Sequence, residues 1–265
     1  MFKWALLTIA MVYLAAILSP LLAIALRFDA SSLADFQAKH IILQALLLTL
    51  KTSLIVTTAA LVIGLPVAIC LARANFRARG LLNLLVDVPI ALPPVVIGVG
   101  LLVVWGRRGL IGQFLDAYGI HISFTTLAVC MAQFVVASPY FVRIAQSGLQ
   151  AVPMELEEVA RSLGASQLKV WATITVPMAS RAIFAGLVTC WARAMGEFGA
   201  TLVFAGNFPG RTQTMPLAVF IALQLDLSAA IVLATLMLVF AVTGFAVAQY
   251  LLRRFATNHV AAEVV

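Results

Sequence analysis

Six long apolar runs constrain this chain more than any other feature of its sequence. A helix needs about 20 mostly apolar residues to cross the hydrocarbon core of a bilayer. Six segments reach that length, approximately residues 4–26, 45–72, 84–104, 122–144, 183–205 and 228–252. These runs are continuous and do not alternate with polar residues, which excludes a membrane β-barrel. The sequence therefore predicts an all-α integral membrane protein, residues 1–265, forming one domain with about six transmembrane helices.

The composition agrees with a membrane protein. Charged residues make up only 10% of the chain and hydrophobic residues 63%, whereas a soluble domain has about 25% charged residues. A net charge of +7 would suggest nucleic acid binding in a soluble protein. Here the basic residues lie in short loops beside the apolar runs, where they determine topology. We therefore expect lipid, and no nucleic acid, around this chain. The first run is longer than a signal-peptide core of roughly 7–15 residues, so we expect it to be a mature span.

Lysine and arginine are distributed unequally between the two sets of alternating loops. Of the 17 such residues, ten lie in one set of loops or at the edge of a run beside it, five lie in the other set, and two, Lys51 and Arg193, lie deeper within the runs. Because loops rich in these residues stay in the cytoplasm, we expect both termini to be cytoplasmic. The first set consists of Lys3, Arg73, Arg77, Arg79, Arg143, Arg161, Lys169, Arg181, Arg253 and Arg254, and the second of Arg27, Lys39, Arg107, Arg108 and Arg211.

The longest loop of the richer set, residues 150–177, is unusually polar and has the marks of a helix. Pro153 suits an early turn, the acidic residues Glu155, Glu157 and Glu158 suit the positive N-terminal end, and Lys169 lies toward the other end. Ala160, Leu163 and Leu168 form a partial apolar stripe, which requires a surface to pack against. An amphipathic helix lying on lipid is the alternative, but the acidic start and the lack of a strong basic face disfavour it.

The spacing within this loop resembles a known signature. The chain reads Glu158, Val159 and Ala160, then three residues, Gly164, nine residues, and Ile174, Thr175, Val176 and Pro177. This resembles the loop of ABC importer membrane subunits, written EAA, three residues, G, nine residues, I-x-L-P; Val159 and Val176 depart from it. The resemblance implies a type I ABC importer fold, in which this loop forms a coupling helix that docks on a separate ATP-hydrolysing subunit. The coupling positions are Glu158, Ala160, Gly164, Ala165, Ile174 and Pro177.

Simple chemistry suits such a docking role. Glu158 supplies a charge that a partner arginine can pair with, and the small Ala160 and Ala165 leave room for close packing. Gly164, which has no Cβ, allows either a sharp turn or the close approach of a partner surface.

Two further stretches narrow the resemblance. "GRRGLIGQFLDAYGI" at residues 106–120 and "ARAMGEFGATLVFAGNFPGRTQTMPLAVF" at residues 192–220 resemble the permease subunits of molybdate transporters, and are also similar to those of tungstate and sulfate transporters. The likeness covers most of the chain from about residue 46 onward. It implies a bacterial or archaeal cytoplasmic membrane protein that imports molybdate, or a similar tetrahedral oxyanion, by alternating access. The implied partners are a second permease copy, two ABC ATPase copies and a periplasmic or lipid-anchored binding protein.

The fifth run contains the candidates for contact with the anion. Arg193 and Glu197 are four residues apart, on one helix face. Ionisable residues at membrane depth usually face the bundle interior or a water-filled cavity. We expect Glu197 to form a structural ion pair, and for Arg193 we favour contact with the anion over that role. Backbone N–H groups and hydroxyls are suitable lining, offered by Thr189, Gly196, Gly199 and Thr201, although helix packing is the alternative role for these glycines and threonines. Pro93 and Pro94 must interrupt the third run, along a cavity or as a packing kink. The candidate pathway residues are therefore Arg193, Glu197, Thr201, Pro93 and Pro94.

Several charged residues outside that group have two possible roles. Lys51 and Asp87 are expected to be interfacial charges, with a gate contact as the alternative. Arg107, Arg108 and Arg211 lie in outer loops, where they either are simply solvated or attract the anion and its binding protein.

Other classes of function fit less well. The chain has no G-x-x-x-x-G-K-[ST] loop, so any ATP hydrolysis belongs to another chain. Cys70, Cys130 and Cys190 lie in apolar runs without CxxC spacing, which supports neither disulfides nor a metal site. His40, His121 and His259 form no paired motif, which argues against an intramembrane enzyme. We thus expect no catalytic, cofactor or metal site. A secondary anion transporter remains the alternative, although inverted repeats typical of that class are not evident.

Overall fold

The computed structural model describes the backbone of residues 2–28 and 36–262, and the side chains of residues 3–28 and 40–251. Every regular element in these ranges is helical. Four of the described helices are long and apolar enough to cross a membrane, or up to six if each of two bent pairs counts as one span. The all-α architecture with several apolar helices is therefore confirmed. The side chains of Lys39, Arg253, Arg254 and His259 lie outside the described residues.

The long helices follow the apolar runs closely. They are α1 (Phe2–Leu26), the continuous unit of α2 (Phe36–Ala59), η2 (Ala60–Gly64) and α3 (Leu65–Arg73), then α7 (Thr126–Gln150) and α14 (Leu227–Ala262). The π-helical turn η2 ends two residues before Pro66, which has no N–H to donate to the turn before it.

The third run is a broken helix. It forms α4 (Arg79–Ala91) and α5 (Pro94–Trp105), whose axes differ by 112°. Leu92 and Pro93 have extended backbone at the break. Because Pro93 and Pro94 donate no backbone hydrogen bond, the helix cannot continue through them. The expected disruption at the proline pair is therefore present, and residues 84–104 do not form one straight span.

The fifth run differs from the continuous helix expected over residues 183–205. It forms α11 (Ser180–Met195) and α12 (Gly199–Ala205), separated by three residues. Gly196 ends α11, and the Glu197 carboxylate accepts a hydrogen bond from the backbone N–H of Ala200 in the first turn of α12. A side chain thus takes over a backbone bond that a continuous helix would make. A short apolar helix, α13 (Met215–Leu225), follows and was not predicted.

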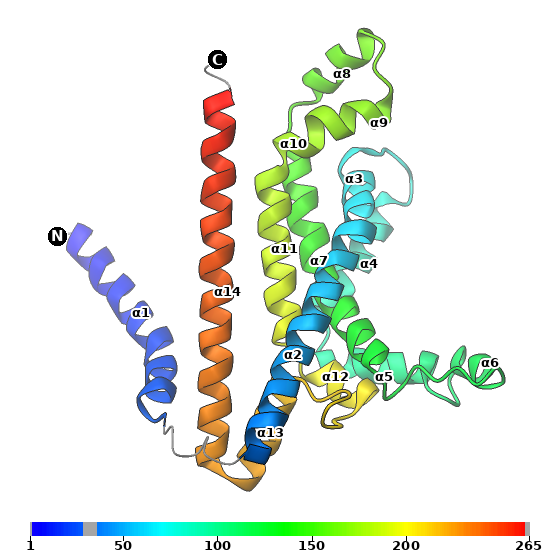
Figure 1. Ribbon diagram of the computed structural model, residues 1–265. Helices are drawn as coiled ribbons and strands as arrows, with labels where there is room; N and C mark the ends of the chain where they lie inside the picture. Colours follow the sequence, from blue (N-terminus) through cyan, green and yellow to red (C-terminus); the bar gives the residue numbers. More distant parts are fainter. Residues whose placement is uncertain (1, 29–35, 263–265) are drawn as a thin grey trace.

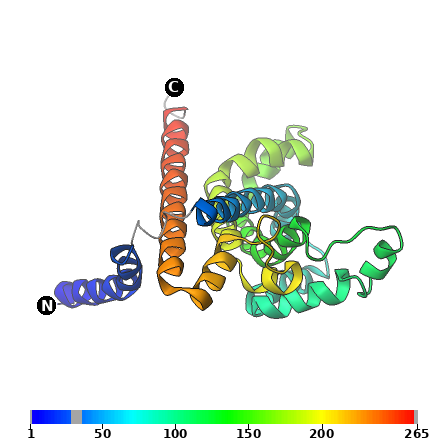
Figure 2. The same cartoon turned by 60° about the horizontal axis from the view of Figure 1, so that its bottom comes forward.

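Helix α7 lies at the centre of the bundle and packs against α2, α3, α11 and α12 (Figures 1 and 2). Its contact with α11 is close because small residues face the partner: Gly148 lies against Ala182, and Gly186 lies against Phe141. Phe141 and Leu149 are fully buried in this core. By contrast, α1 stands apart from the bundle and contacts α14.

The two ends of the molecule differ in character. One end carries the segment between α7 and α11, which consists of α8 (Met154–Ser162), α9 (Gln167–Val170), η3 (Trp171–Thr175) and α10 (Val176–Met178). The opposite end carries α12, α13 and the protruding α6 (Gly112–Asp116) (Figure 1). The polar loop and the two helix breaks therefore lie in separate regions of the fold.

Candidate functional site

The coupling segment, residues 150–177, is built around a turn at Gly164. This glycine separates α8 from α9 and has φ +89°, a conformation that side chains with a Cβ rarely adopt. Apart from its two chain neighbours, no described residue comes within 4 Å of the position that a Cβ would take there. Ser166 then begins α9, accepting a hydrogen bond from the backbone N–H of Lys169 at 3.4 Å. The positive φ of Gly164 fits the sharp turn, which is one of the two roles that the sequence allows for this glycine.

The tip of the coupling segment exposes apolar side chains. Leu163 is 83% exposed and Leu168 77%. Glu158 is also exposed, whereas Ala160 is half-buried. Exposed apolar residues beside a charge at the end of a bundle are typical of a surface that binds another protein. Of the other motif positions, Ala165 and Ile174 are half-buried and Pro177 is exposed.

Glu157, one residue before the motif, is the residue that sequence reasoning missed. Its side chain is 3% exposed and forms an ion pair with Arg73 at the end of α3, with 2.7 Å between Nε and Oε1. The Thr175 hydroxyl donates to the same carboxylate oxygen at 2.9 Å. Arg73 also donates to the backbone carbonyl of Val152 at 2.8 Å. No local sequence signal distinguishes Glu157 from its acidic neighbours, because its partners come from distant parts of the chain.

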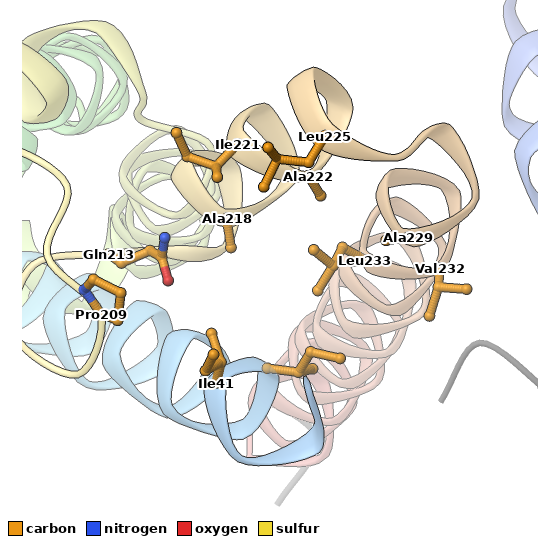
Figure 3. Close-up of a pocket in the computed structure, with 11 residues that line it drawn as sticks. Ile41, Pro209, Gln213, Ala218, Ile221, Ala222, Leu225, Ala229, Val232 and Leu233 are labelled. Carbon is orange, nitrogen blue, oxygen red and sulfur yellow. The ribbon is translucent and has the colours of Figure 1, made fainter. Parts of the chain in front are cut away.

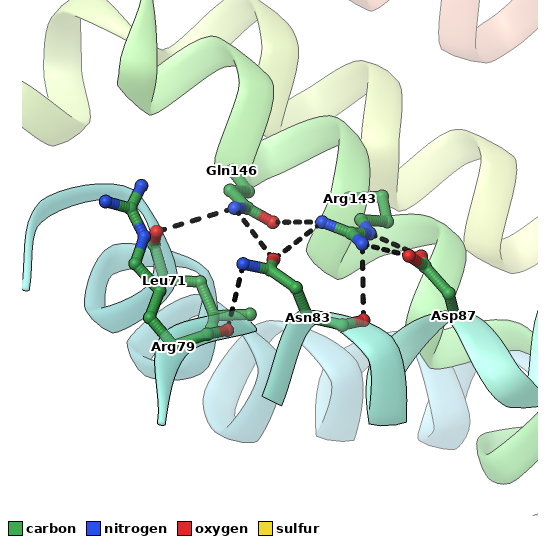
Figure 4. A network of polar contacts seen from close by, with 6 residues as sticks. All are labelled: Leu71, Arg79, Asn83, Asp87, Arg143 and Gln146. Atoms are coloured by element: carbon green, nitrogen blue, oxygen red, sulfur yellow. Dashed lines mark hydrogen bonds and ion pairs between the residues drawn. The ribbon is translucent and has the colours of Figure 1, made fainter. Parts of the chain in front are cut away.

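A second polar network joins α4 to α7 near the same end of the bundle (Figure 4). Arg143 of α7 donates from Nε to Oδ1 of Asp87 at 2.6 Å and from Nη1 to the Asn83 side chain at 2.7 Å. Gln146 also contacts Arg143 and Asn83, and donates to the backbone carbonyl of Leu71 in α3 at 3.4 Å. Asp87 is therefore paired within this chain, and α3, α4 and α7 are linked by one network.

The two helix breaks contact each other. Gly199, which begins α12, packs on Pro94 and Val95 at the start of α5, and Gly98 of α5 lies against the backbone of Ala200. A Cβ on Gly98 would come within 2.9 Å of that backbone. The absence of a side chain on these glycines permits the close crossing of α5 and α12. The structure thus brings the proline break and the α11–α12 break into one region, which the sequence did not reveal.

The candidate anion residues lie at or near this crossing. Arg193 forms an ion pair with Glu197, with 2.7 Å between Nη1 and Oε2. The Glu197 side chain is 1% exposed and that of Arg193 is 26% exposed. Thr201 of α12 is fully buried, and its hydroxyl has no hydrogen-bond partner among the described residues. The Thr189 hydroxyl, in contrast, donates to the Ala185 carbonyl of its own helix.

The three arginines that the sequence places in outer loops, Arg107, Arg108 and Arg211, have local partners or exposed positions. Arg107 contacts His121 at 3.0 Å and lies 3.4 Å from Asp116, forming a small exposed cluster. The backbone carbonyl of Arg211 accepts a hydrogen bond from Thr126 at the start of α7. Lys51 is exposed on α2.

Two pockets within the chain are lined by apolar side chains. The first, about 360 Å³, lies between α2, α13 and α14, and Gln213 is the polar residue in its lining (Figure 3). The second, about 290 Å³, lies between α3, α4 and α7 beside Pro89 and Pro139. Neither offers a cation or a cluster of donors to a doubly charged anion. Among the described residues, no group of three or more His, Cys, Asp and Glu side chains is placed to hold a metal ion.

Solved structures show which fold this architecture has. The chain matches a structure of the MetNI methionine ABC transporter with a TM-score of 0.66 at 17% identity, covering 83% of this chain and 99% of that one. It matches a bacterial alginate ABC transporter with a TM-score of 0.73 at 14% identity, covering 96% and 95%. The fold is therefore that of the transmembrane subunits of type I ABC importers.

Sequence comparison then identifies the family. Residues 60–257 match the family of binding-protein-dependent transport system inner membrane components, and the chain belongs to that family. The matched region includes both helix breaks and the coupling segment. The protein is thus a multi-pass inner-membrane permease subunit of an ABC transporter.

Several curated relatives share substantial identity with this chain. It is 40% identical over 222 residues to the molybdenum transport system permease protein ModB of Mycobacterium tuberculosis, covering 84% of each chain. It is 41% identical over 182 residues to the ModB protein of Escherichia coli K12, covering 68% of this chain and 80% of the relative. A probable sulfate transport system permease protein of Nephroselmis olivacea is 34% identical over 245 residues, covering 91% and 86%.

Proposed function

We propose that this chain is the permease of an ATP-driven importer that moves molybdate into the cytoplasm. Identities of 40% and 41% with molybdenum transport permeases support this substrate. The more distant sulfate relative supports sulfate or tungstate as the alternative within one substrate class. These anions share charge and tetrahedral shape, so a protein that delivers the anion would make much of the discrimination between them.

The projecting coupling segment is the observation that carries the proposal. Its motif spacing, its exposed Leu163 and Leu168, and the exposed Glu158 together form a surface that this chain leaves uncovered. We assign that surface to a separate ABC ATPase subunit, with Glu158, Ala160, Gly164, Ala165, Ile174 and Pro177 as the coupling positions. The sequence has no phosphate-binding loop of its own, which supports hydrolysis in that partner.

The assembly proposed here contains two permeases, two ATPase subunits and one binding protein. One matched solved structure is an alginate ABC transporter in complex with a ligand-bound periplasmic protein, which supports a binding-protein partner. The two pockets described above are apolar, so a pathway for a dianion is better placed where two copies of the permease meet.

We place the anion pathway beside the crossing of α5 and α12. Arg193, which is partly exposed, supplies positive potential there, while Glu197 limits it. Thr201, Pro93 and Pro94 complete the candidate set. A binding site made of several unpaired cations would hold the anion too tightly, because transport requires release as well as binding.

Transport would proceed by alternating access. ATP binding draws the two ATPase subunits together, the paired coupling segments follow, and the permeases open toward the binding protein. Hydrolysis then returns them to the inward-facing state. This is rigid-body rotation about an interface.

The proposal is tested by reconstituting the purified permease with its candidate ATPase subunit in proteoliposomes. ATP hydrolysis and anion uptake are measured with the binding protein carrying molybdate, tungstate or sulfate. We expect molybdate to stimulate both activities and Glu158→Lys to abolish the stimulation. Glu155→Lys, the same charge change on an exposed residue outside the motif, is the matched control and should have a smaller effect.

Two outcomes would contradict the proposal. If the ATPase subunit does not bind, the match to the coupling motif has no functional meaning. If uptake proceeds without ATP and follows an ion gradient, the chain is a secondary transporter.

A further inference from the structure

A single buried carboxylate holds both ends of the coupling segment. Glu157 lies in α8, near the start of the coupling segment, and Thr175 is the last residue of η3, near the end of the coupling segment. The Thr175 hydroxyl donates to Glu157 Oε1 at 2.9 Å, and both residues are at least nine-tenths buried. Glu155 and Glu158, on the same helix, are exposed. Glu157 thus faces the bundle while its acidic neighbours face outward.

The same carboxylate also binds the end of another span. Arg73 is the last residue of α3, and its side chain is only 6% exposed. It forms the 2.7 Å ion pair with Glu157 and donates to the backbone carbonyl of Val152, which lies just before α8. The end of α3 is therefore fastened to the coupling segment at two points, one in α8 and one in the approach to it.

Such a pair serves positioning more than stability. Desolvating two charges costs much of the free energy that their attraction returns, so a buried ion pair seldom adds net stability. Pulling the two partners apart, however, would leave a charge uncompensated in a buried place. Elements joined in this way resist separation, and they therefore tend to move together.

The contact between Arg73 and Glu157 links two elements that do not follow each other in the chain. The coupling segment continues directly from α7 and into α11, so its displacement reaches those two helices through the backbone. It is not adjacent to α2–α3 along the chain, because α4, α5, α6 and α7 lie between them. Two residues before Arg73, the Leu71 carbonyl accepts a hydrogen bond from the Gln146 side chain. Gln146 belongs to the network that joins Arg143 of α7 to Asn83 and Asp87 of α4. The end of α3 thus connects the coupling segment with α4, whose far end reaches the crossing of α5 and α12.

We propose that Arg73, Glu157 and Thr175 form a clasp that makes the coupling segment move as one body with the α2–α3 span. Glu157 is then a positioning residue of the transport cycle, distinct from the exposed Glu158 that faces the ATPase partner. The clasp deepens the proposed function and rests on it: force delivered by the ATPase subunit reaches α2–α3 and α4 as well as α7 and α11.

The test measures coupling in the complete transporter in proteoliposomes, as ATP hydrolysed per anion imported. Glu157→Gln removes the charge but keeps an acceptor for Thr175. Thr175→Val removes the hydroxyl at nearly constant shape, and Thr175→Ser keeps it. We expect Glu157→Gln to raise the ATP used per anion by about two- to thirtyfold, the range of coupling energies found for residues that link two sites. Thr175→Val should raise it less, and Thr175→Ser should match the wild type.

The control is Glu155→Gln, which removes an exposed carboxylate from the same helix and should leave the ratio unchanged. A structural anchor alone would lower uptake and ATP hydrolysis in proportion, because it would reduce only the amount of assembled transporter. An unchanged ratio in Glu157→Gln therefore overturns the clasp. If the wild-type complex shows no ATP-driven uptake, the proposed function itself fails, and that outcome is distinct from the first.

Discussion

Glu197 illustrates how one buried side chain can determine local structure. Its two carboxylate oxygens have different partners: Oε1 accepts from the Ala200 N–H at 2.9 Å, and Oε2 pairs with Arg193 at 2.7 Å. The carboxylate caps the start of α12 and neutralises a cation at the same break. Both contacts are consistent with a structural role for Glu197, and the Arg193 side chain remains partly exposed.

We expect Glu197→Ala to destabilise the permease by about 1–3 kcal/mol, because it removes the cap of α12 and leaves Arg193 without its buried partner. Glu197→Gln keeps an acceptor for the Ala200 N–H and should cost less. Thermal unfolding of the purified protein in detergent measures both, with Glu158→Gln on an exposed carboxylate as the control. A melting temperature equal to the wild type in Glu197→Ala would contradict the structural role.

Substitutions at Gly164 can distinguish its two possible roles, which are to form a sharp turn and to allow a partner surface to approach closely. A β-branched residue at φ +89° is strained by about 1–3 kcal/mol, so Gly164→Val should impair ATP-driven uptake. Asparagine tolerates positive φ better, so Gly164→Asn should retain uptake if only the turn matters. Loss of uptake in both variants would instead indicate close approach by the ATPase subunit. Gly80→Ala, in open space without positive φ, is the control.

At the scale of elements, the crossing of α5 and α12 depends on glycines placed on the contact face. Gly98 and Gly199 allow the two short helices to approach backbone to backbone. Gly100, two residues along α5, has no neighbour within 4 Å of its Cβ position. The same helix therefore has one glycine at a close helix contact and another whose Cβ position is open among the described residues.

Gly98→Leu should separate α5 from α12, with a cost of about 1–3 kcal/mol from overpacking and a loss of anion uptake. Gly100→Leu adds the same side chain to the open face and should leave the thermal stability of the permease unchanged. The two variants are compared by thermal unfolding and by uptake in proteoliposomes. Greater destabilisation by Gly100→Leu than by Gly98→Leu would show that the crossing does not depend on the glycine.

At the scale of the whole molecule, the ends of the bundle can be related to the two sides of the membrane. The N-terminal end of α1 and the C-terminal end of α14 both point toward the end that carries α8 and α9 (Figure 1). This arrangement suits an orientation with both termini and the coupling segment in the cytoplasm, as the distribution of lysine and arginine predicts.

Cysteine labelling tests that orientation. In a background where Cys70, Cys130 and Cys190 are replaced by alanine, Leu110→Cys in the loop before α6 should react with a membrane-impermeant maleimide in intact cells. Leu163→Cys in the coupling segment should react only after permeabilisation. Both side chains are exposed, so access depends on the side of the membrane. The opposite pattern would reverse the topology.

Predictability from the sequence varied with the range of the interaction. The apolar runs were predictable because the composition of a short stretch of chain determines whether it can enter lipid. A turn at Gly164 was one of two predicted roles, because the φ preference of glycine is a local property. The interruption at Pro93 and Pro94 was predictable for the same reason, since proline lacks an N–H. The break between α11 and α12 was not, because it requires the Glu197 side chain to replace a backbone hydrogen bond.

The sequence by itself determined that this chain spans a membrane as a helical bundle and that a polar segment with coupling-motif spacing joins two of its spans. Those properties follow from hydrophobic transfer and from residue spacing along one chain. Only the tertiary structure decided which acid of α8 is buried, which arginine it pairs with, and that the two helix breaks meet. Ion pairs and glycine contacts of this kind join residues far apart in sequence. They form only when the packing of the helices brings the buried partners together.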